Sequence, residues 1–201
     1  MLNWDALEDR CKNCAKCGLA QTRTNVVFGV GPKNTDVMFV GEGPGEQEDL
    51  QGEPFVGAAG KLLDDMLSII DLGRHNCYIA NIVKCRPPRN RDPEEEEQEA
   101  CIDYLRNQVA LIRPKIIVCL GRVAAKKLID PDFRITRQHG NWFCSNGVWM
   151  TAIYHPSALL RDLKKRPETF EDLLSIRDKC REVHADLGEY DDRCCSCPHL
   201  G

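Results

Sequence analysis

Four short apolar runs alternate along the chain with longer segments whose apolar residues recur at helical spacing. The runs lie at residues 36–41, 77–83, 115–121 and 148–154, and each is typical of a buried strand. Helices are predicted at residues 4–10, 58–71, 93–112, 122–129 and 168–184. This alternation predicts an α/β fold with a parallel sheet, helices on both faces and right-handed crossovers. We expect a single domain over residues 1–190 and a short polar tail at 191–201 that is a candidate for disorder.

A long glycine-rich stretch at residues 41–60 connects the first predicted strand to the helix that follows it. A long loop after a parallel strand is usually functional, and ligands of open α/β sheets bind beyond the carboxyl ends of the strands. The stretch contains clustered carboxylates and one aromatic residue, Phe55, but it matches neither the phosphate-binding P-loop nor the dinucleotide fingerprint. The carboxylates suit general-base work or stabilisation of a cation, and the alternative is an ordinary solvated loop.

The composition restricts the class of protein. A chain of 201 residues is long enough for one substantial core, and a net charge of −4 excludes a uniformly basic nucleic-acid coat. No apolar run approaches the length of a membrane span, and the N-terminus has no basic and apolar signal segment. We therefore expect a cytoplasmic protein with no membrane partner.

Polar residues follow three of the predicted strands. Glu42 follows the first, Asn81 lies near the end of the second, and His155 follows the last. We expect them to meet at one edge of the sheet, although a lone histidine is more often structural than catalytic. Basic residues cluster near the same edge, either as a solvated face or as a surface for phosphates, at Lys84, Arg86, Arg89, Arg91 and Arg161.

Twelve cysteines are many for a chain with α/β patterning, which is unlike a small disulfide scaffold. Cys14-x-x-Cys17 with Cys85 and Cys101 could form a site of four thiolates, which hold either zinc or an iron–sulfur cluster. The spacing does not choose between the two, and Cys11 could replace either N-terminal ligand. The alternative is a set of ordinary reduced thiols. Cys77 and Cys119 lie in apolar strands, where we expect inert core residues.

Several ordered motifs extend across residues 11–175. They are Cys14-x-x-Cys17, the segments 23–29, 41–49 and 54–60, Asn81-Ile-Val-Lys-Cys-Arg-Pro-Pro-x-Asn-Arg91, Cys101, and His155-Pro-Ser-x-Leu-Leu-Arg161. Together they closely resemble the family 4 uracil-DNA glycosylases, the iron–sulfur branch of that superfamily. The resemblance implies a three-layer α/β/α sandwich with a central four-stranded parallel sheet. It also implies a 4Fe–4S cluster on Cys14, Cys17, Cys85 and Cys101.

The resemblance further implies a monofunctional glycosylase that turns uracil out of DNA and hydrolyses its N-glycosidic bond in base excision repair. Glu42 and His155 would be catalytic, Phe55 would stack on uracil and Asn81 would read its edge. Glu48 or the Gly43–Gly45 backbone would exclude the methyl group of thymine. The predicted substrate-binding residues are Gly41, Gly43, Glu48, Phe55 and Asn81, and the predicted DNA-binding residues are Arg86, Ser157, Leu159, Leu160 and Arg161, with both leucines as a wedge.

The expected partners are uracil-containing DNA, single- or double-stranded, and uracil as product, with the protein acting as a monomer. The sequence departs from the family pattern at Ala158, where relatives often carry an aromatic residue, and in the cysteines of the tail. The chain lacks the basic, histidine-containing loop of the branch that traps DNA covalently, so we expect turnover. Two alternatives are a catalytically inactive iron–sulfur DNA-binding module of the same fold and, less favoured, a P-loop-like nucleotide enzyme.

Overall fold

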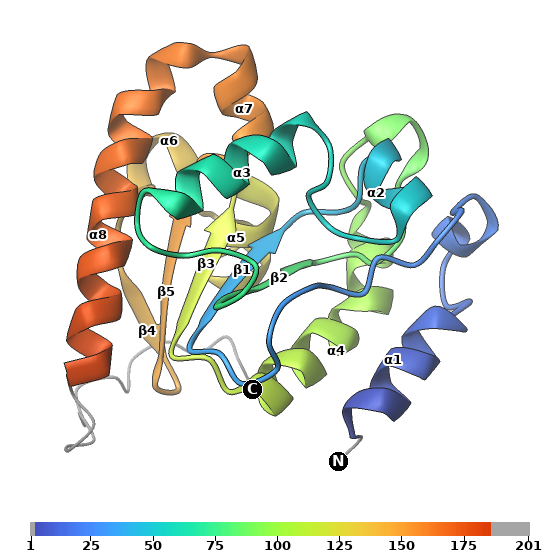
Figure 1. Ribbon diagram of the computed structural model, residues 1–201. Coiled ribbons are helices and arrows are strands. Elements are labelled where there is room, and N and C mark those ends of the chain that lie inside the picture. The colour runs from blue at the N-terminus through green and yellow to red at the C-terminus, as the bar shows by residue number, and fades with distance from the viewer. Residues whose placement is uncertain (1–2, 186–201) are drawn as a thin grey trace.

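A five-stranded sheet forms the centre of the computed structural model, which describes residues 3–185 (Figure 1). The strand order is β2-β1-β3-β5-β4. The strands are β1 (Val37–Gly41), β2 (Tyr78–Asn81), β3 (Ile116–Leu120), β4 (Phe143–Ser145) and β5 (Val148–Ile153). β2, β1, β3 and β5 are parallel, so the four predicted strands and their parallel arrangement are confirmed.

The fifth strand, β4, was not predicted. It pairs antiparallel with β5 and forms an edge of the sheet. The hairpin turns at Asn146 and Gly147, whose φ angles of 50° and 79° are those of a two-residue turn that favours Asn-Gly. This dipeptide was the sequence signal for the hairpin, and the prediction of a purely four-stranded sheet overlooked it.

Helices cover both faces of the sheet, so the three-layer prediction is confirmed (Figure 1). The α-helices are α1 (Trp4–Lys12), α2 (Glu46–Gln51), α3 (Ala58–Ser68), α4 (Glu95–Ile112), α5 (Arg122–Leu128), α6 (Ile135–Gln138), α7 (Pro156–Arg161) and α8 (Arg166–Ala185). Three 3₁₀ turns within residues 3–185 complete the set: η1 (Gly18–Gln21), η2 (Pro88–Asn90) and η3 (Leu163–Lys165). The short helices α2, α6 and α7 were not predicted.

The strands alternate their side chains between two cores. Met38 and Val40 of β1 face the core shared with α1, α4 and α5, whereas Val37 and Phe39 face the core shared with α3, α7 and α8. Burial of β1 on both faces is typical of a central strand in a parallel sheet. This arrangement places the carboxyl ends of β1, β2, β3 and β5 at one edge, where ligand sites of α/β sheets form.

Two further predictions concern the cysteines and the ends of the chain. Cys119 in β3 and Cys77, one residue before β2, are both fully buried, as expected of core residues. The predicted tail at 191–201, with Cys194, Cys195 and Cys197, lies outside the described residues. Within residues 3–185, each helix is too short or too polar to cross a lipid bilayer.

Candidate functional site: a cavity at the carboxyl edge of the sheet

A cavity of about 630 Å³ opens beyond the carboxyl ends of the parallel strands. This volume lies within the usual range for a small-molecule site. The structure brings eight of the twelve predicted catalytic, substrate-binding and DNA-binding residues to this cavity, namely Glu42, Gly43, Glu48, Phe55, Asn81, His155, Ser157 and Arg161. As expected, the ends of β1, β2 and β5 bring Glu42, Asn81 and His155 to one cavity.

The floor of the cavity is formed where β1 and β2 end side by side. Gly41 pairs with Asn81 in the parallel register. A Cβ atom at position 41 would collide with Asn81 Oδ1 and lie 2.6 Å from Cζ of Phe55, so only glycine fits there. Asn81 is 1% exposed, and among the described residues its Oδ1 has no hydrogen-bond partner. A buried acceptor without a partner costs about 1–3 kcal/mol, which a ligand N–H could recover.

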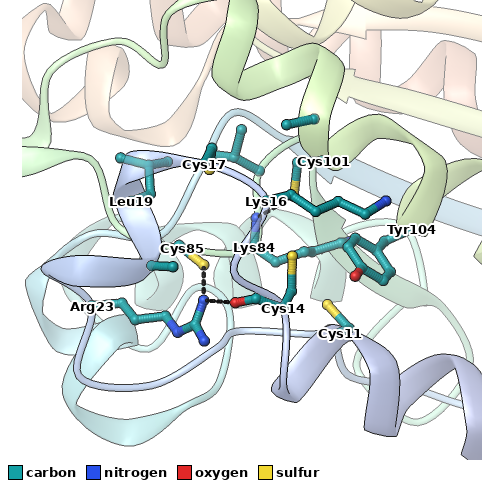
Figure 2. A pocket seen from close by; sticks show the side chains of 13 residues that line it. Cys11, Cys14, Lys16, Cys17, Leu19, Arg23, Lys84, Cys85, Cys101 and Tyr104 are labelled. Atoms are coloured by element: carbon teal, nitrogen blue, oxygen red, sulfur yellow. Dashed lines mark hydrogen bonds between the residues drawn. The ribbon is translucent and has the colours of Figure 1, made fainter.

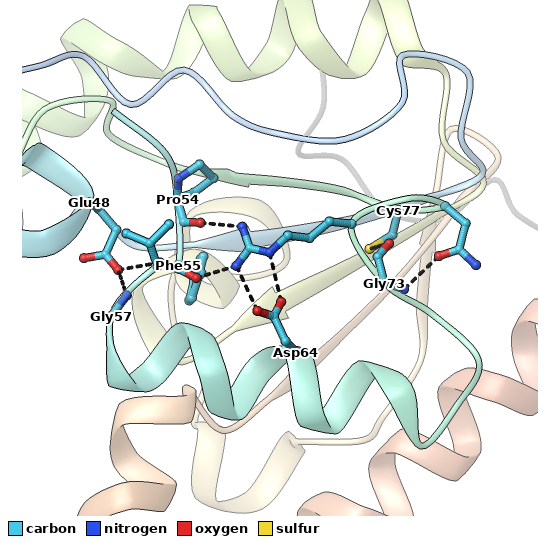
Figure 3. Close-up of polar contacts among 10 residues, drawn as sticks. Glu48, Pro54, Phe55, Gly57, Asp64, Gly73 and Cys77 are labelled. Atoms are coloured by element: carbon cyan, nitrogen blue, oxygen red, sulfur yellow. Dashed lines mark hydrogen bonds and ion pairs between the residues drawn. The ribbon is translucent and has the colours of Figure 1, made fainter. Parts of the chain in front are cut away.

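Phe55 is held in an unfavourable backbone conformation by a network of polar contacts (Figure 3). Its φ angle is 56°, in the left-handed region that non-glycine residues rarely adopt. Arg74 donates hydrogen bonds to the carbonyl oxygens of Pro54, at 2.9 Å, and Phe55, and its Nε is 2.9 Å from Asp64 Oδ1. A Cβ at Gly60 would overlap the Phe55 carbonyl, so helix α3 begins directly against this segment.

Glu48 of α2 fixes the other side of the Phe55 segment. Its Oε1 accepts hydrogen bonds of 2.9 Å from the backbone N–H groups of Val56 and Gly57 (Figure 3). The residue lines the cavity, but these two bonds give it a structural role that the sequence did not suggest. Its role against the methyl group of thymine stays a prediction.

His155 lies beside the Phe55 ring, with 5.6 Å between the ring centroids. It caps helix α7, and its Nδ1 accepts from the Ser157 backbone N–H at 3.2 Å and lies 2.8 Å from the Ser157 hydroxyl. Because Nδ1 is the acceptor, the ring proton is on Nε2. Burial, reinforced by Arg161, lowers the His155 pKa to about 4, so the ring is neutral at pH 7 and its Nε2–H can donate.

The surroundings of Glu42 raise the pKa of its carboxyl group, whereas those of His155 lower the pKa of the imidazole. Burial, reinforced by the neighbouring Asp92 carboxyl group, raises the Glu42 pKa to about 7, and Arg122 acts in the opposite direction. A carboxyl group that titrates near neutrality is suited to general acid–base work. Asp92 and Arg122 were missed by the sequence reasoning. Arg122 could have been found, because it directly follows the end of the third predicted strand.

The predicted basic edge is only partly available to a ligand. Lys84 is fully buried, and its Nζ donates to Gln108 Oε1 at 2.7 Å. Arg91 makes two hydrogen bonds to the Glu97 carboxylate, at 2.8 and 2.7 Å. The expectation that Lys84 contributes to a phosphate-binding surface is therefore corrected, since its ammonium group is buried within the fold. Arg91 lines the cavity as well as binding Glu97, so its contribution stays a prediction.

The remaining DNA-binding candidates differ in exposure. Leu159 is 2% exposed and belongs to the core under α7, whereas Leu160 is 43% exposed. The prediction of a wedge made by both leucines is thus corrected, because only Leu160 is at the surface. Arg86 lies outside the cavity lining, 3.4 Å from Glu46 and hydrogen-bonded to Asn90.

A second, smaller pocket gathers the predicted cysteine ligands (Figure 2). Cys14 and Cys17 come from the segment between α1 and η1, Cys85 from the loop after β2, and Cys101 from α4. Arg23 donates to Cys85 Sγ at 3.3 Å and to the Cys14 carbonyl at 2.7 Å, and the Lys84 backbone N–H donates to Cys101 Sγ at 3.3 Å. All four are free cysteines.

Cys11 also lines this pocket, as the sequence allowed. Burial raises the pKa of Cys11 to about 12 and that of Cys101 to about 11, so both thiols are protonated at neutral pH unless a ligand replaces the proton. In the described part of the chain, no group of three or more histidine, cysteine or acidic side chains is arranged to hold a metal ion.

Comparison with known proteins identifies the family. The model of the uracil-DNA glycosylase superfamily matches residues 28–176. This chain belongs to the uracil-DNA glycosylase superfamily. The type-4 uracil-DNA glycosylase of Archaeoglobus fulgidus is 46% identical over 198 residues, which cover 94% of this chain and 100% of the relative. That of Thermotoga maritima is 46% identical over 162 residues, covering 79% and 83%. That of Sulfurisphaera tokodaii is 44% identical over 183 residues, covering 87% and 83%. The predicted membership of the superfamily, and of its family 4 branch, is confirmed.

The Phe55 network can be tested by protein stability. We expect Arg74→Gln to lower the free energy of unfolding by about 1–3 kcal/mol, because the Pro54 and Phe55 carbonyls lose a charged donor. Asp64→Asn is the matched control and should have a smaller effect, since both carbonyl bonds remain. Urea denaturation monitored by circular dichroism measures both. A loss in Asp64→Asn equal to or greater than that in Arg74→Gln would show that the carbonyl bonds do not carry the stabilisation.

Proposed function

We propose that this protein is a uracil-DNA glycosylase that turns a uracil nucleotide out of DNA into the cavity at the carboxyl edge of the sheet and hydrolyses its N-glycosidic bond. Membership of the superfamily supports the activity. The observation that carries the assignment to this cavity is the buried, unpartnered Asn81 Oδ1 close to the Phe55 ring. A base within a duplex is inaccessible to such a pocket, so the nucleotide has to leave the stack.

Base recognition follows from these two side chains. Phe55 stacks on the flipped ring, Asn81 Oδ1 accepts from uracil N3–H and the Asn81 amide donates to O4. Cytosine presents the opposite donor and acceptor pattern at these positions, and each unmatched buried partner costs about 1–3 kcal/mol. The Glu48 carboxylate or the Gly43–Gly45 backbone excludes the methyl group of thymine.

In the chemical step, the electron pair of the glycosidic bond goes to uracil and positive charge develops on the sugar. The neutral His155 donates a hydrogen bond from Nε2 to the negative charge that forms on uracil O2. The Glu42 carboxylate orients the attacking water and accepts its proton as the new bond to the sugar forms. Both residues line the cavity. Their presence with Phe55 and Asn81 argues against the inactive-module alternative.

The surface around the cavity would engage the DNA backbone. Arg161 and Ser157 lie at the cavity and would contact phosphates, and exposed Leu160 would fill the space that the flipped base leaves. Arg86 would lie nearer the periphery of this surface. We also propose that the protein acts on DNA as a monomer.

We also propose that Cys14, Cys17, Cys85 and Cys101 hold a 4Fe–4S cluster. Four thiols from three separate segments converge on one pocket, and two of their sulfur atoms already accept hydrogen bonds. Thiolates in this number suit zinc as well, and iron is proposed because of the resemblance to family 4. Bound there, the cluster would cross-link the N-terminal segment, the loop after β2 and α4, a structural role.

Release of uracil from a single-uracil oligonucleotide tests the function. We expect the wild-type protein to release uracil, and His155→Ala and Glu42→Gln to lower the single-turnover rate by about 10²–10³ while DNA affinity changes far less. His75→Ala and Glu96→Gln are matched controls at exposed positions and should keep the wild-type rate. A wild-type protein that binds the DNA without releasing uracil would support the inactive-module alternative, and equal losses of rate and affinity would contradict the catalytic roles.

The cysteine assignment is tested by iron and sulfide analysis of purified, folded protein. We expect Cys101→Ala to lose most of the iron and the brown colour, because one ligand is removed. Cys11→Ala should keep both, since Cys11 is not among the four proposed ligands, and Cys119→Ala controls for loss of a buried thiol. Zinc in place of iron in the wild-type protein, or full iron content in Cys101→Ala, would contradict the proposal.

A further inference from the structure

Asp92 and Arg122 join two elements at one side of the proposed active site. Asp92 lies between η2 and α4, Arg122 is the first residue of α5, and their side chains form an ion pair. Both residues line the active-site cavity and also a second cavity of about 520 Å³ between α4 and α5. The ion pair therefore forms part of the wall between the two cavities.

The same pair lies at the cavity beside the proposed general base, Glu42. Glu42, Asp92 and Arg122 line the same cavity, where Asp92 raises the pKa of Glu42 and Arg122 lowers it. Two neighbouring carboxyl groups cannot both be ionised without cost, so Asp92 favours the protonated form of Glu42. The positive charge of Arg122 favours the ionised form.

We propose that Asp92 and Arg122 are positioning residues for uracil excision, which hold the Glu42 carboxyl group and set its affinity for the proton of the attacking water. This inference rests on the proposed function. Asp92 supplies a negative charge, and Arg122 orients Asp92 through their ion pair and limits the effect of that charge. A base with a raised proton affinity removes a proton from water more readily at neutral pH.

The other charged or titratable groups at this cavity do not replace the pair. They come from α2, the segment before α4, the end of β5, α7 and η3, and they are Glu46, Glu48, Arg91, Tyr154, His155, Arg161 and Lys165. Glu48 binds backbone N–H groups, Arg91 binds Glu97, and His155 is neutral above about pH 4. Among the described residues, Asp92 and Arg122 are the charged groups that shift the pKa of Glu42.

The test is the pH dependence of the single-turnover excision rate on a single-uracil oligonucleotide. Removing the Asp92 charge in Asp92→Asn should move the midpoint of the acid limb to lower pH, because ionised Glu42 loses a repulsive neighbour. Arg122→Gln should move it to higher pH, because ionised Glu42 loses an attractive one. Asp92 and Arg122 side chains are 53% and 55% exposed, so we expect shifts of about 0.2–0.7 pH units in each direction.

Matched controls lie on the far side of the wall. Asp130→Asn and Lys126→Gln change the same charges but line only the second cavity, so their midpoints should equal that of the wild type. Arg122→Lys keeps the charge and should stay close to the wild-type midpoint. Carbon-13 NMR titration of the Glu42 carboxyl group without DNA, assigned by its loss in Glu42→Gln, reports the same shifts independently of activity.

Unmoved midpoints in both Asp92→Asn and Arg122→Gln, or shifts of the same sign, would overturn this inference while wild-type uracil release leaves the proposed function intact. Absence of uracil release by the wild-type protein would overturn the proposed function, and the NMR titration would then still decide whether the pair acts on Glu42.

Discussion

The parallel pairing of β1 with β2 is the constraint on which the site depends. The register places Gly41 opposite Asn81 at the carboxyl end of both strands. Because position 41 has no side chain, the Asn81 amide and the Phe55 ring can approach the same small volume. A slip of the register by one residue would turn the Asn81 side chain to the other face of the sheet. Asn81 is therefore positioned by backbone hydrogen bonds of the central sheet, whereas Phe55 is held by the bonds of Arg74 and Glu48 to its segment.

The side chains proposed to contact the substrate are held in conformations, hydrogen-bonding states or protonation states that are each unfavourable on their own. Phe55 has a left-handed backbone, Asn81 buries an unpartnered oxygen, and the pKa of Glu42 is raised while that of His155 is lowered. Such local costs persist only where the surroundings over-determine them. The bonds of Arg74 and Glu48 to the Phe55 segment supply that restraint on one side. Ser157 supplies it for His155 by fixing the tautomer.

The elements that the sequence predicted well are those whose pattern spans several repeats. The apolar strands and the long helices bury whole faces, so their positions agree with the structure to within a few residues. α2 and α7 have six residues each, too few for a helical period to emerge within a glycine-rich or proline-containing segment. The hairpin between β4 and β5 was detectable from Asn146-Gly147, but its first strand has three residues.

The candidate site, like the fold, was predicted from the sequence only in part. The strand-end rule brought Glu42, Asn81 and His155 together, and the resemblance supplied the specific chemistry. Burial and pairing could not be predicted, because they depend on neighbours distant in sequence. Lys84 faces Gln108 across the core, Leu159 packs beneath α7, and Asp92 meets Arg122 from 30 residues away. The exposure and the partner of each of these side chains are determined only by the folded chain.

The central claim is that one extruded pyrimidine occupies the space between the Phe55 ring and the Asn81 amide. The most direct measurement is a crystal structure of the Glu42→Gln protein with a uracil-containing oligonucleotide. We expect the uracil ring stacked on Phe55, with its N3 about 3 Å from Asn81 Oδ1. Uracil bound at another surface, or inside the cavity with Asn81 Oδ1 still unpartnered, would contradict the claim.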